Sequence, residues 1–165
     1  MKLAWYLVHT KPRQEAVAFS QLQRQGYPCY LPKIRIERIR RRKAEIVVEP
    51  MFPRYLFVQL DSSDQGKSWS PIRSTLGVSQ LVHFGGQAAR VDDRLIDLLC
   101  QREHVMPTEA MFNPGDLVVI ADGPFAGIEA VYHIADAERR AFILLEILSK
   151  PVSMWIDATS LHKVN

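Results

Sequence analysis

The chain has 165 residues, of which 47% are hydrophobic and 24% charged, and its formal net charge is +3. This length fits one ordinary domain or two small ones, and the composition excludes disorder over most of the chain. No apolar run approaches the ~20 residues that a membrane helix needs, and the first residues lack the apolar core of a secretory signal. We therefore expect a cytoplasmic protein without a membrane-spanning segment, whose two cysteines, Cys29 and Cys100, are free thiols.

The first fifty residues predict strands around one amphipathic helix. Residues 3–10 are dense in β-forming side chains, which is typical of a buried strand. Residues 11–26 predict a helix, because Pro12 suits a first helical turn, Gly26 suits a helix end, and apolar side chains gather on one side. Residues 27–50 then predict a strand, a charged hairpin and a returning strand, with isoleucines that alternate with charges.

The hairpin is strongly basic near its tip. Residues 33–43 contain seven basic side chains and one acidic side chain, Glu37. Two interpretations stay open at this point. The residues form either an ordinary solvated hairpin tip or a surface that contacts phosphate, which such clusters suit.

Residues 49–61 predict a strand with two apolar faces. Side chains alternate across a strand, so Leu56, Val58 and Leu60 point to one side, and the rings of Tyr55 and Phe57 point to the other. The first side packs on the core. The second side carries two rings beside a Phe-Pro pair, and an apolar patch of this kind usually marks an interface rich in aromatic anchors. The alternative is that the rings are buried inside their own domain.

The remaining segments complete an α+β pattern followed by a second unit. Residues 69–74 predict a helical turn, 78–86 a short strand, and 92–104 a helix with acids in its first turn. The order β-α-β-β-α-β is ferredoxin-like, the arrangement also found in RRM domains. Residues 105–116 contain two prolines and no periodicity, which predicts a linker at 105–113 that leads to a small unit at 114–165.

The C-terminal unit predicts a small β-barrel of four or five short strands. A strand at 117–121 meets a Gly-Pro-Phe-Ala-Gly turn and a second strand at 128–134. The segment 137–150 is ambiguous, because it is rich in helix formers and its apolar pattern fits either form. As a helix, it would line one side with Phe142, Leu145 and either Leu148 or Ser149.

The sequence shows no set of residues with catalytic spacing. It contains no phosphate-binding glycine loop and no nucleophile elbow, and its five histidines are dispersed. Asp92 and Asp93 are adjacent, but at a helix start they serve as cap and first-turn acid. We therefore assign no catalytic residue, metal or cofactor, and we expect binding residues in place of enzyme chemistry.

Four stretches together resemble the NusG family of transcription elongation factors. They are WYLVHTKPRQE, EPMFPRYLFVQLD, IRSTLGV and PGDLVVIADGPFAG, the last of which is similar to a KOW motif. Within the family the likeness is to RfaH-like specialised paralogs. It depends on CYLPK, on the short basic hairpin, and on EPMFPRYLF, in which family members of the NusG type usually have glycine where Arg54 stands. The resemblance implies an N-terminal polymerase-binding domain (1–104), a linker (105–113) and a C-terminal KOW domain (114–165).

The resemblance also implies a function and binding residues. The function is transcription antitermination with suppression of pausing, in which the aromatic face docks on the β′ clamp helices of RNA polymerase. The polymerase-binding residues would be Phe52, Pro53, Tyr55, Phe57 and Phe84.

RfaH-like proteins also bind the displaced non-template DNA strand and contact the β gate loop of the polymerase. The gate-loop contact stays open, because this chain has GKSWSPIRST where those proteins have a His-Thr-Thr stretch. The DNA-binding residues would be Lys11, Arg13, Arg24, Gln25 and Arg73.

The C-terminal domain would bind ribosomal protein S10 or termination factor Rho through Phe125 and Ile128. In RfaH-like proteins this domain also has a resting form, an α-helical hairpin that covers the polymerase-binding face. The matching interdomain ion pair would be Glu49 with Arg140.

We expect the β-barrel as the ground state, with the helical hairpin as the alternative. In a hairpin, Pro124 inside the first helix would cost ~3 kcal/mol and two glycines ~1 kcal/mol each. The alternative function is an RNA-binding or ribosome-associated KOW protein, which would bind structured RNA in a salt-sensitive way. In either case we expect a monomer.

Overall fold

The computed structural model describes residues 2–63, 68–105 and 127–149, and they form an α+β fold around an antiparallel sheet. The sheet has the order β2-β5-β1-β6, and β9 also pairs with β1. In its centre Leu7 of β1 lies opposite Phe57 of β5. The strands are β1 (Leu3–Thr10), β2 (Cys29–Tyr30), β5 (Tyr55–Asp61), β6 (Val78–Leu81) and β9 (Arg90–Val91).

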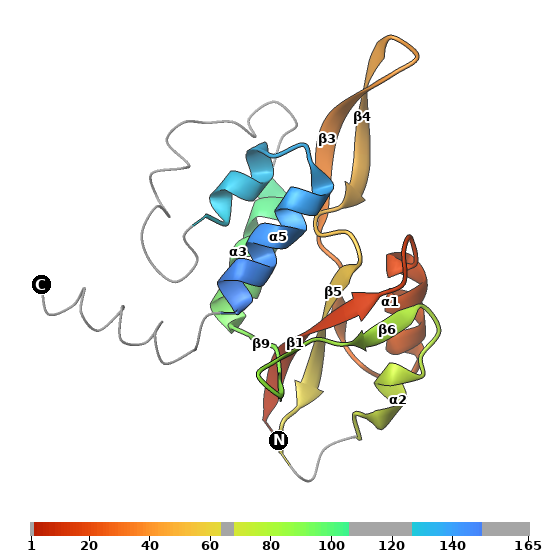
Figure 1. Ribbon diagram of the computed structural model, residues 1–165, viewed down its shortest axis with the longest axis vertical. Coiled ribbons are helices and arrows are strands. Elements are labelled where there is room, and N and C mark those ends of the chain that lie inside the picture. Colours follow the sequence, from red (N-terminus) through yellow and green to blue (C-terminus); the bar gives the residue numbers. More distant parts are fainter. Residues whose placement is uncertain (1, 64–67, 106–126, 150–165) are drawn as a thin grey trace, which may run out of the picture.

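Helices cover both faces of this sheet (Figure 1). Helices α1 (Glu15–Arg24) and α2 (Ser70–Arg73) lie on one side. Helices α3 (Asp93–Val105) and α5 (Ala137–Leu148) lie on the other side. The short 3-10 helix η1 (Glu129–His133) precedes α5.

Two smaller ribbons complete the described part of the fold. Strands β3 (Lys33–Arg40) and β4 (Lys43–Pro50) form the predicted hairpin, which projects from the body of the molecule (Figure 1). The region predicted as one strand, 78–86, contains β6 and β7 (His83–Phe84), and β7 forms a short ribbon with β8 (Gln87–Ala88), which follows that region. No helix of the described residues is long and apolar enough to span a membrane.

The predicted alternation along β5 is confirmed. Leu56, Val58 and Leu60 belong to one buried cluster, which also contains Ala18 and Leu22 of α1. The other face of the strand contributes to a second cluster, whose members come from the sheet, α3, η1 and α5. Full burial of one such apolar side chain stabilises a fold by roughly 1.5–3 kcal/mol, so both sides of β5 anchor the molecule.

Helix α1 begins later than predicted. Its first residue is Glu15, and Pro12 and Arg13 lie in the turn before it. Arg13 has a φ of 61°, in the left-handed region that an α-helix excludes. The placement of Arg13 on the helix is therefore wrong, because its backbone closes the β1–α1 turn.

The expected barrel strands are wrong for the described C-terminal residues. The predicted strand at 128–134 contains η1, and 137–148 is the α-helix of the alternative. Asp136 caps α5, because its carboxylate accepts hydrogen bonds from the backbone N–H groups of Glu138 (3.0 Å) and Arg139 (3.4 Å). Local helix propensity, this cap and an apolar stripe that packs on the body together select the helix.

Gly127 does not oppose the helical form, contrary to the expectation. Gly127 has a φ of 96° but precedes η1, so its flexibility serves a turn and costs no helical residue. Gly123, Pro124, the predicted strand at 117–121 and most of the predicted linker lie outside the described residues. The predicted helix side is confirmed only in part, because Leu148 is buried and Leu145 packs against the core, whereas Phe142 is 60% exposed. The buried residues of α5 are Arg140, Ala141, Leu144, Ile147 and Leu148.

Candidate functional site

The aromatic side of β5 forms a cluster of rings in the centre of the molecule. Phe52 meets Phe57 edge-on with ring centroids 6.4 Å apart, and Tyr30 stacks on Phe57 at 6.1 Å. Tyr55 lies beside His9, with centroids 5.0 Å apart. Of the five predicted polymerase-binding residues, two are fully buried and three are half-buried. The buried ones are Phe52 and Phe57, and the half-buried ones are Pro53, Tyr55 and Phe84.

Residues from beyond the predicted N-terminal domain cover much of this face. One part of the cover comes from the N-terminal domain itself, because Leu95 and Leu99 of α3 belong to the same buried cluster. This part agrees with the alternative in which the rings are buried inside their own domain. The rest of the cover comes from η1 and α5, which we call the C-terminal cover (residues 128–148). Its members in the cluster are Ile128, Val131, Tyr132, Ala141, Leu144, Ile147 and Leu148. Ile128, a predicted partner-binding residue, is thus fully buried here, and Phe125 lies outside the described residues.

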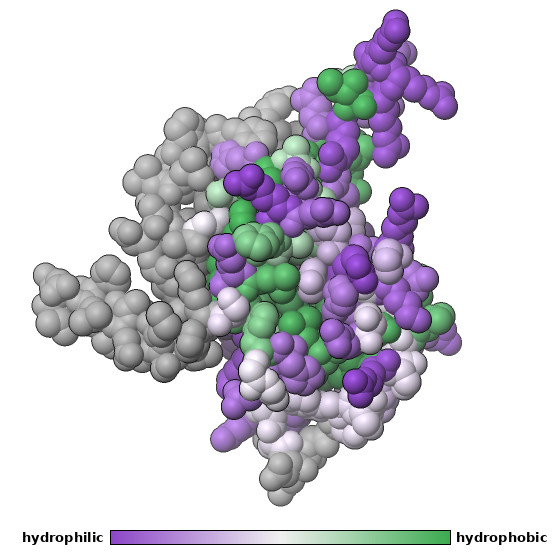
Figure 2. Space-filling model, viewed as in Figure 1, coloured by the Kyte–Doolittle hydropathy of each residue, from purple (hydrophilic) through white to green (hydrophobic). Residues whose placement is uncertain are grey.

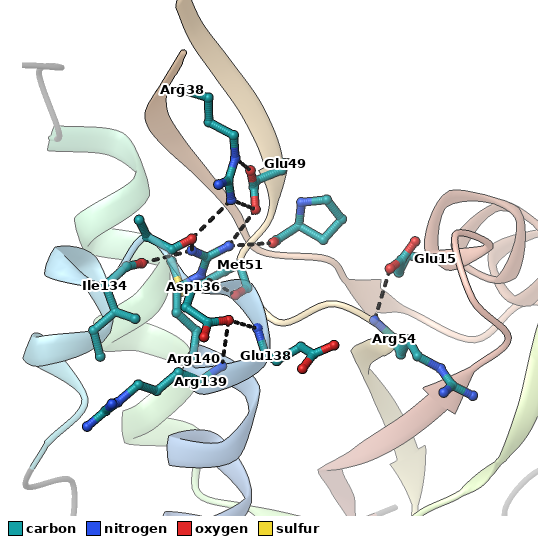
Figure 3. A network of polar contacts seen from close by, with 12 residues as sticks. Glu15, Arg38, Glu49, Met51, Arg54, Ile134, Asp136, Glu138, Arg139 and Arg140 are labelled. Atoms are coloured by element: carbon teal, nitrogen blue, oxygen red, sulfur yellow. Dashed lines mark hydrogen bonds and ion pairs between the residues drawn. The ribbon is translucent and has the colours of Figure 1, made fainter. Parts of the chain in front are cut away.

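Arg140 is the largest fully buried side chain of the described residues, and its guanidinium is hydrogen-bonded on all sides. Its Nε donates to the Met51 carbonyl at 2.8 Å, and its Nη1 donates to the carbonyls of Ile134 (2.8 Å) and Ala135 (3.1 Å). Its Nη2 donates to Glu49 Oε2 at 2.7 Å (Figure 3). A buried guanidinium is tolerated only with a counter-charge and satisfied donors, and this site supplies both.

Glu49 also accepts hydrogen bonds from a second arginine, Arg38 of the hairpin. Arg38 Nε lies 2.8 Å from Oε1, and Arg38 Nη2 lies 3.0 Å from Oε2 (Figure 3). Burial by itself would raise the pKa of Glu49, but hydrogen bonds from Arg38 and Arg140 outweigh it and lower the pKa below its usual value. The hydrogen bond to Glu49 raises the pKa of Arg38.

Arg38 also touches the C-terminal cover directly, because its Nη2 donates to the Ala135 carbonyl at 3.0 Å. Sequence reasoning counted Arg38 only as one of the basic hairpin residues. Ile34 lies opposite Glu49 in the hairpin register, so their side chains share one side of the ribbon. Arg38 lies four residues after Ile34 in the same strand, so alternation places it on that side too. That signal becomes usable only once the register of the hairpin is known. The contact to Ala135 has no local signal at all, because the two residues are 97 positions apart.

A cation–π contact forms a further link to the C-terminal cover. The guanidinium carbon of Arg102 on α3 lies 4.6 Å from the centroid of the Tyr132 ring in η1. Such contacts contribute roughly 0.5–2 kcal/mol, with larger values where the charge is desolvated. Sequence reasoning missed this pair, because neither residue belongs to a recognisable motif.

The predicted DNA-binding residues come from segments that meet at one edge of α1. Gln25 Nε2 donates to Thr75 Oγ1 at 2.8 Å, which ties the end of α1 to the turn after α2. Gly77 in that turn has a φ of 88°, and a Cβ there would lie 2.8 Å from the Ala18 nitrogen. Lys11 donates its backbone N–H to the Gly77 carbonyl at 2.9 Å. The exposed members of the set are Lys11, Arg13, Arg24 and Arg73.

An open groove lies beside this edge. Its volume is about 500 Å³, and Arg73 is one of its lining residues. Trp69, which also lines it, donates its indole N–H to the Asp61 carbonyl at 3.0 Å and is thereby fixed in orientation. The other lining residues are Ser70, Ile72, Gln80, Leu81 and His83.

Arg54 has a left-handed backbone conformation, which is unusual for a residue other than glycine. Its φ is 71°, a conformation that glycine adopts freely and other residues rarely do. Its backbone N–H donates to Glu15 Oε2 at 2.9 Å, and its Nε donates to the Thr10 carbonyl at 3.3 Å. These bonds hold a strained backbone in the turn that leads into β5.

The described residues contain no group of three His, Cys, Asp or Glu side chains that is placed to hold a metal ion. Cys29 and Cys100 are free thiols, as predicted. Burial raises the pKa of Cys29 to about 12, so this thiol stays protonated and unreactive at neutral pH.

Comparison with known proteins decides the family. The family model described as "Transcription termination factor nusG" matches residues 3–100, which is more than half of the chain. The chain belongs to the NusG family. The match covers nearly all of the predicted N-terminal domain, including β1, α1, the basic hairpin and the aromatic strand β5.

Individual NusG-family proteins show the same likeness. The NusG protein of Thermus thermophilus, a transcription termination/antitermination protein, is 24% identical over 183 residues, which cover 99% of this chain and all of the relative. The Yersinia pestis NusG protein is 29% identical over 131 residues, covering 74% of this chain and 68% of the relative. A solved structure titled "Domain interaction in Thermotoga maritima NusG" is 25% identical, covers 66% of this chain and 62% of that chain, and has a TM-score of 0.44.

Proposed function

We propose that this chain is a transcription elongation and antitermination factor whose aromatic face binds the β′ clamp helices of RNA polymerase. In this proposal residues 1–104 form the polymerase-binding domain, residues 105–113 a linker and residues 114–165 a KOW domain. Membership of the NusG family supports a role in transcription. The aromatic cluster around Phe52 and Phe57 supports a protein interface, because such rings are typical anchors of protein–protein contacts.

One observation carries the proposal: the C-terminal cover, and not the N-terminal domain alone, completes the burial of the aromatic face. A face that is closed by a segment from another domain can open without unfolding its own domain. In this proposal the chain has a resting form, in which residues 128–148 occupy the polymerase site. This arrangement supports the RfaH-like interpretation of the chain.

The latch of the resting form is the group Arg38, Glu49 and Arg140. One carboxylate accepts hydrogen bonds from two guanidinium groups, and both arginines donate to the Ala135 carbonyl. Removal of the charge of Glu49 would leave Arg140 buried without a counter-charge. Breaking a buried pair in this way costs about 3–5 kcal/mol, and the loss falls on the contact between the cover and the ribbon.

Recruitment would use the α1 edge. Lys11, Arg13, Arg24 and Arg73 are exposed there, and basic side chains next to an open groove suit a single DNA strand. Gln25 is held by Thr75, so its role would be to position the end of α1 or to exchange this bond for a base. We propose the non-template strand as the ligand of this edge.

After release, the C-terminal segment would act as the second binding unit. The segment 142–148 alternates apolar side chains in a way that also fits a strand. Phe142 is 60% exposed on α5, so most of this ring is not buried in the helical form. We propose that the released segment joins a KOW barrel that recruits ribosomal protein S10 or Rho, with Phe125 and Ile128 at the contact.

The test measures the affinity of the full chain for purified core RNA polymerase. We expect Glu49→Gln to raise the apparent affinity by about tenfold or more, because the binding-competent fraction increases. In the Glu49→Gln background, Tyr55→Ala removes a half-buried ring of the face and should reduce affinity by about tenfold or more.

The matched control is Leu76→Ala in the same background. Leu76 is 64% exposed and belongs to neither buried cluster, so its truncation should leave polymerase binding unchanged. Equal affinity of the wild-type and Glu49→Gln chains would show that the cover does not occlude the site. Full binding by the Tyr55→Ala chain would place the polymerase site elsewhere.

A further inference from the structure

The β3–β4 ribbon carries more positive charge than the whole chain. Residues 33–50 hold seven basic and three acidic side chains, a net charge of +4, whereas the chain as a whole has +3. The rest of the molecule is therefore slightly acidic. The ribbon is buried only near its base, where Ile34 and Ile36 lie in the interior. Its projecting end is hydrophilic apart from an apolar side chain near the tip (Figure 2).

The tip is built from residues that do not favour its backbone. Arg40 pairs with Lys43, so Arg41 and Arg42 form a two-residue turn, with φ values of 52° and 65°. A type I′ hairpin turn requires positive φ at both central residues and normally takes Asn-Gly there. Left-handed conformations cost non-glycine residues roughly 1–2 kcal/mol each. A strained segment of this kind is a candidate for a functional surface.

The charges of the outer ribbon are available to a ligand. Arg38 and Glu49 form ion pairs at the base of the ribbon. Five other basic side chains are exposed and have no acidic partner among the residues that the structure describes. They are Arg35, Arg40, Arg41, Arg42 and Lys43.

We propose that this ribbon binds duplex DNA, with the arginine tip on phosphates and the ribbon lying in the major groove. The major groove of B-DNA is about 12 Å wide and admits a two-stranded β-ribbon, whereas the major groove of A-form RNA is too narrow for side-chain access. Ile39 (79% exposed) and Ile46 (55% exposed) lie on one side of the ribbon and can contact thymine methyl groups or sugars. This site is distinct from the α1 edge, to which the proposed function assigns a single strand.

The decisive variant is Arg41→Asn combined with Arg42→Gly. It supplies the preferred turn residues and removes two charges, so it should stabilise the hairpin and weaken DNA binding at the same time. Binding of the full chain to a 20-base-pair duplex is measured by fluorescence anisotropy between 50 and 200 mM salt. We expect a loss of about tenfold in affinity at low salt, and a slope of log K against log salt that is smaller by about two.

The matched control is Arg90→Gln combined with Arg139→Gln, which removes two exposed charges that lie on β9 and α5 and not on the ribbon. Its affinity should stay within about twofold of wild type if the ribbon is the binding site. An equal loss for both variants would mean non-specific attraction and would overturn the proposal. Tighter binding to an RNA duplex or a single strand of the same length would overturn it as well. No polymerase is present, so the result is independent of the proposed polymerase contact.

Discussion

At the scale of single residues, Arg54 shows how a strained backbone can be held by its neighbours. Its positive φ is compensated by hydrogen bonds to Glu15 and Thr10, from elements that lie elsewhere in the chain. The resemblance to the NusG family implies a glycine at this position. The structure supplies the reason, since a left-handed conformation suits glycine.

The left-handed backbone of Arg54 predicts different stabilities for two truncations of this side chain, to alanine and to glycine. Arg54→Ala keeps the unfavourable conformation and loses the bond to Thr10, so it should lower the unfolding free energy by about 1 kcal/mol. Arg54→Gly loses the same bond but relieves the strain, so it should be more stable than Arg54→Ala by about 1 kcal/mol. Urea denaturation of the two variants measures the difference. If the alanine variant were the more stable one, the left-handed strain would be absent in solution.

Glu49 predicts a pH dependence for the C-terminal cover. Two arginines hold the pKa of Glu49 below its usual value of 4.5. The carboxylate therefore stabilises the closed form fully above pH 4.5, and this stabilisation disappears as the pH falls through the lowered pKa. Hydrogen exchange of the α5 amides from pH 7 to pH 3 reports the stability of the cover.

The Glu49→Gln chain is the reference for that measurement. Asp61 and Asp92 also have lowered pKa values, so acid acts on more than one carboxylate. The difference in α5 protection between wild type and Glu49→Gln isolates the contribution of Glu49. It should be constant above pH 4.5 and shrink below it. A difference that persists undiminished at pH 3 would contradict the role of the charged carboxylate.

At the scale of elements, α5 illustrates how an ambiguous segment is decided by its environment. Residues 137–148 contain strong helix formers, and they also alternate as a strand would. The helix buries Leu144, Ile147 and Leu148 on the aromatic cluster and places Arg140 on Glu49. Of the helix side predicted from spacing, Leu145 and Leu148 pack on the body of the molecule, whereas Phe142 faces solvent.

The packing of α5 can be tested with two truncations on opposite sides of the helix. Leu144 is fully buried, and a buried Leu→Ala change costs about 2–5 kcal/mol, so Leu144→Ala should release the cover. Phe142→Ala removes an exposed ring and should leave the cover in place. Hydrogen exchange of the α5 amides distinguishes them, with rapid exchange expected only for Leu144→Ala. Equal protection in both variants would mean that α5 does not pack through this side.

At the scale of the whole molecule, the central question is which domain seals the aromatic face. Phe57 has no exposed surface, and α3 contributes part of its cover. The remainder comes from residues 128–148, which the predicted domain boundary places in another unit. The latch and the cation–π pair between Arg102 and Tyr132 connect the two parts. The proposed mechanism therefore depends on detachment of the cover, which the polymerase-binding test addresses.

The sequence by itself determined the elements with strong local signals. Alternation fixed the two faces of β5, because side chains in a strand point to opposite sides irrespective of the surroundings. The motifs of β1, β5 and the turn after α2 also indicated the NusG family. Both kinds of signal are contained in short stretches of residues.

Only the tertiary structure decided the form of the C-terminal segment and the partners of its charges. Helix and strand were both compatible with residues 137–148, and the choice came from burial against a sheet that is distant in sequence. The charged partners are also distant in sequence. Glu49 and Arg140 are 91 positions apart, and Arg38 reaches Glu49 across the hairpin. Contacts of this range depend on the summed packing of the molecule, which no local pattern of residues encodes.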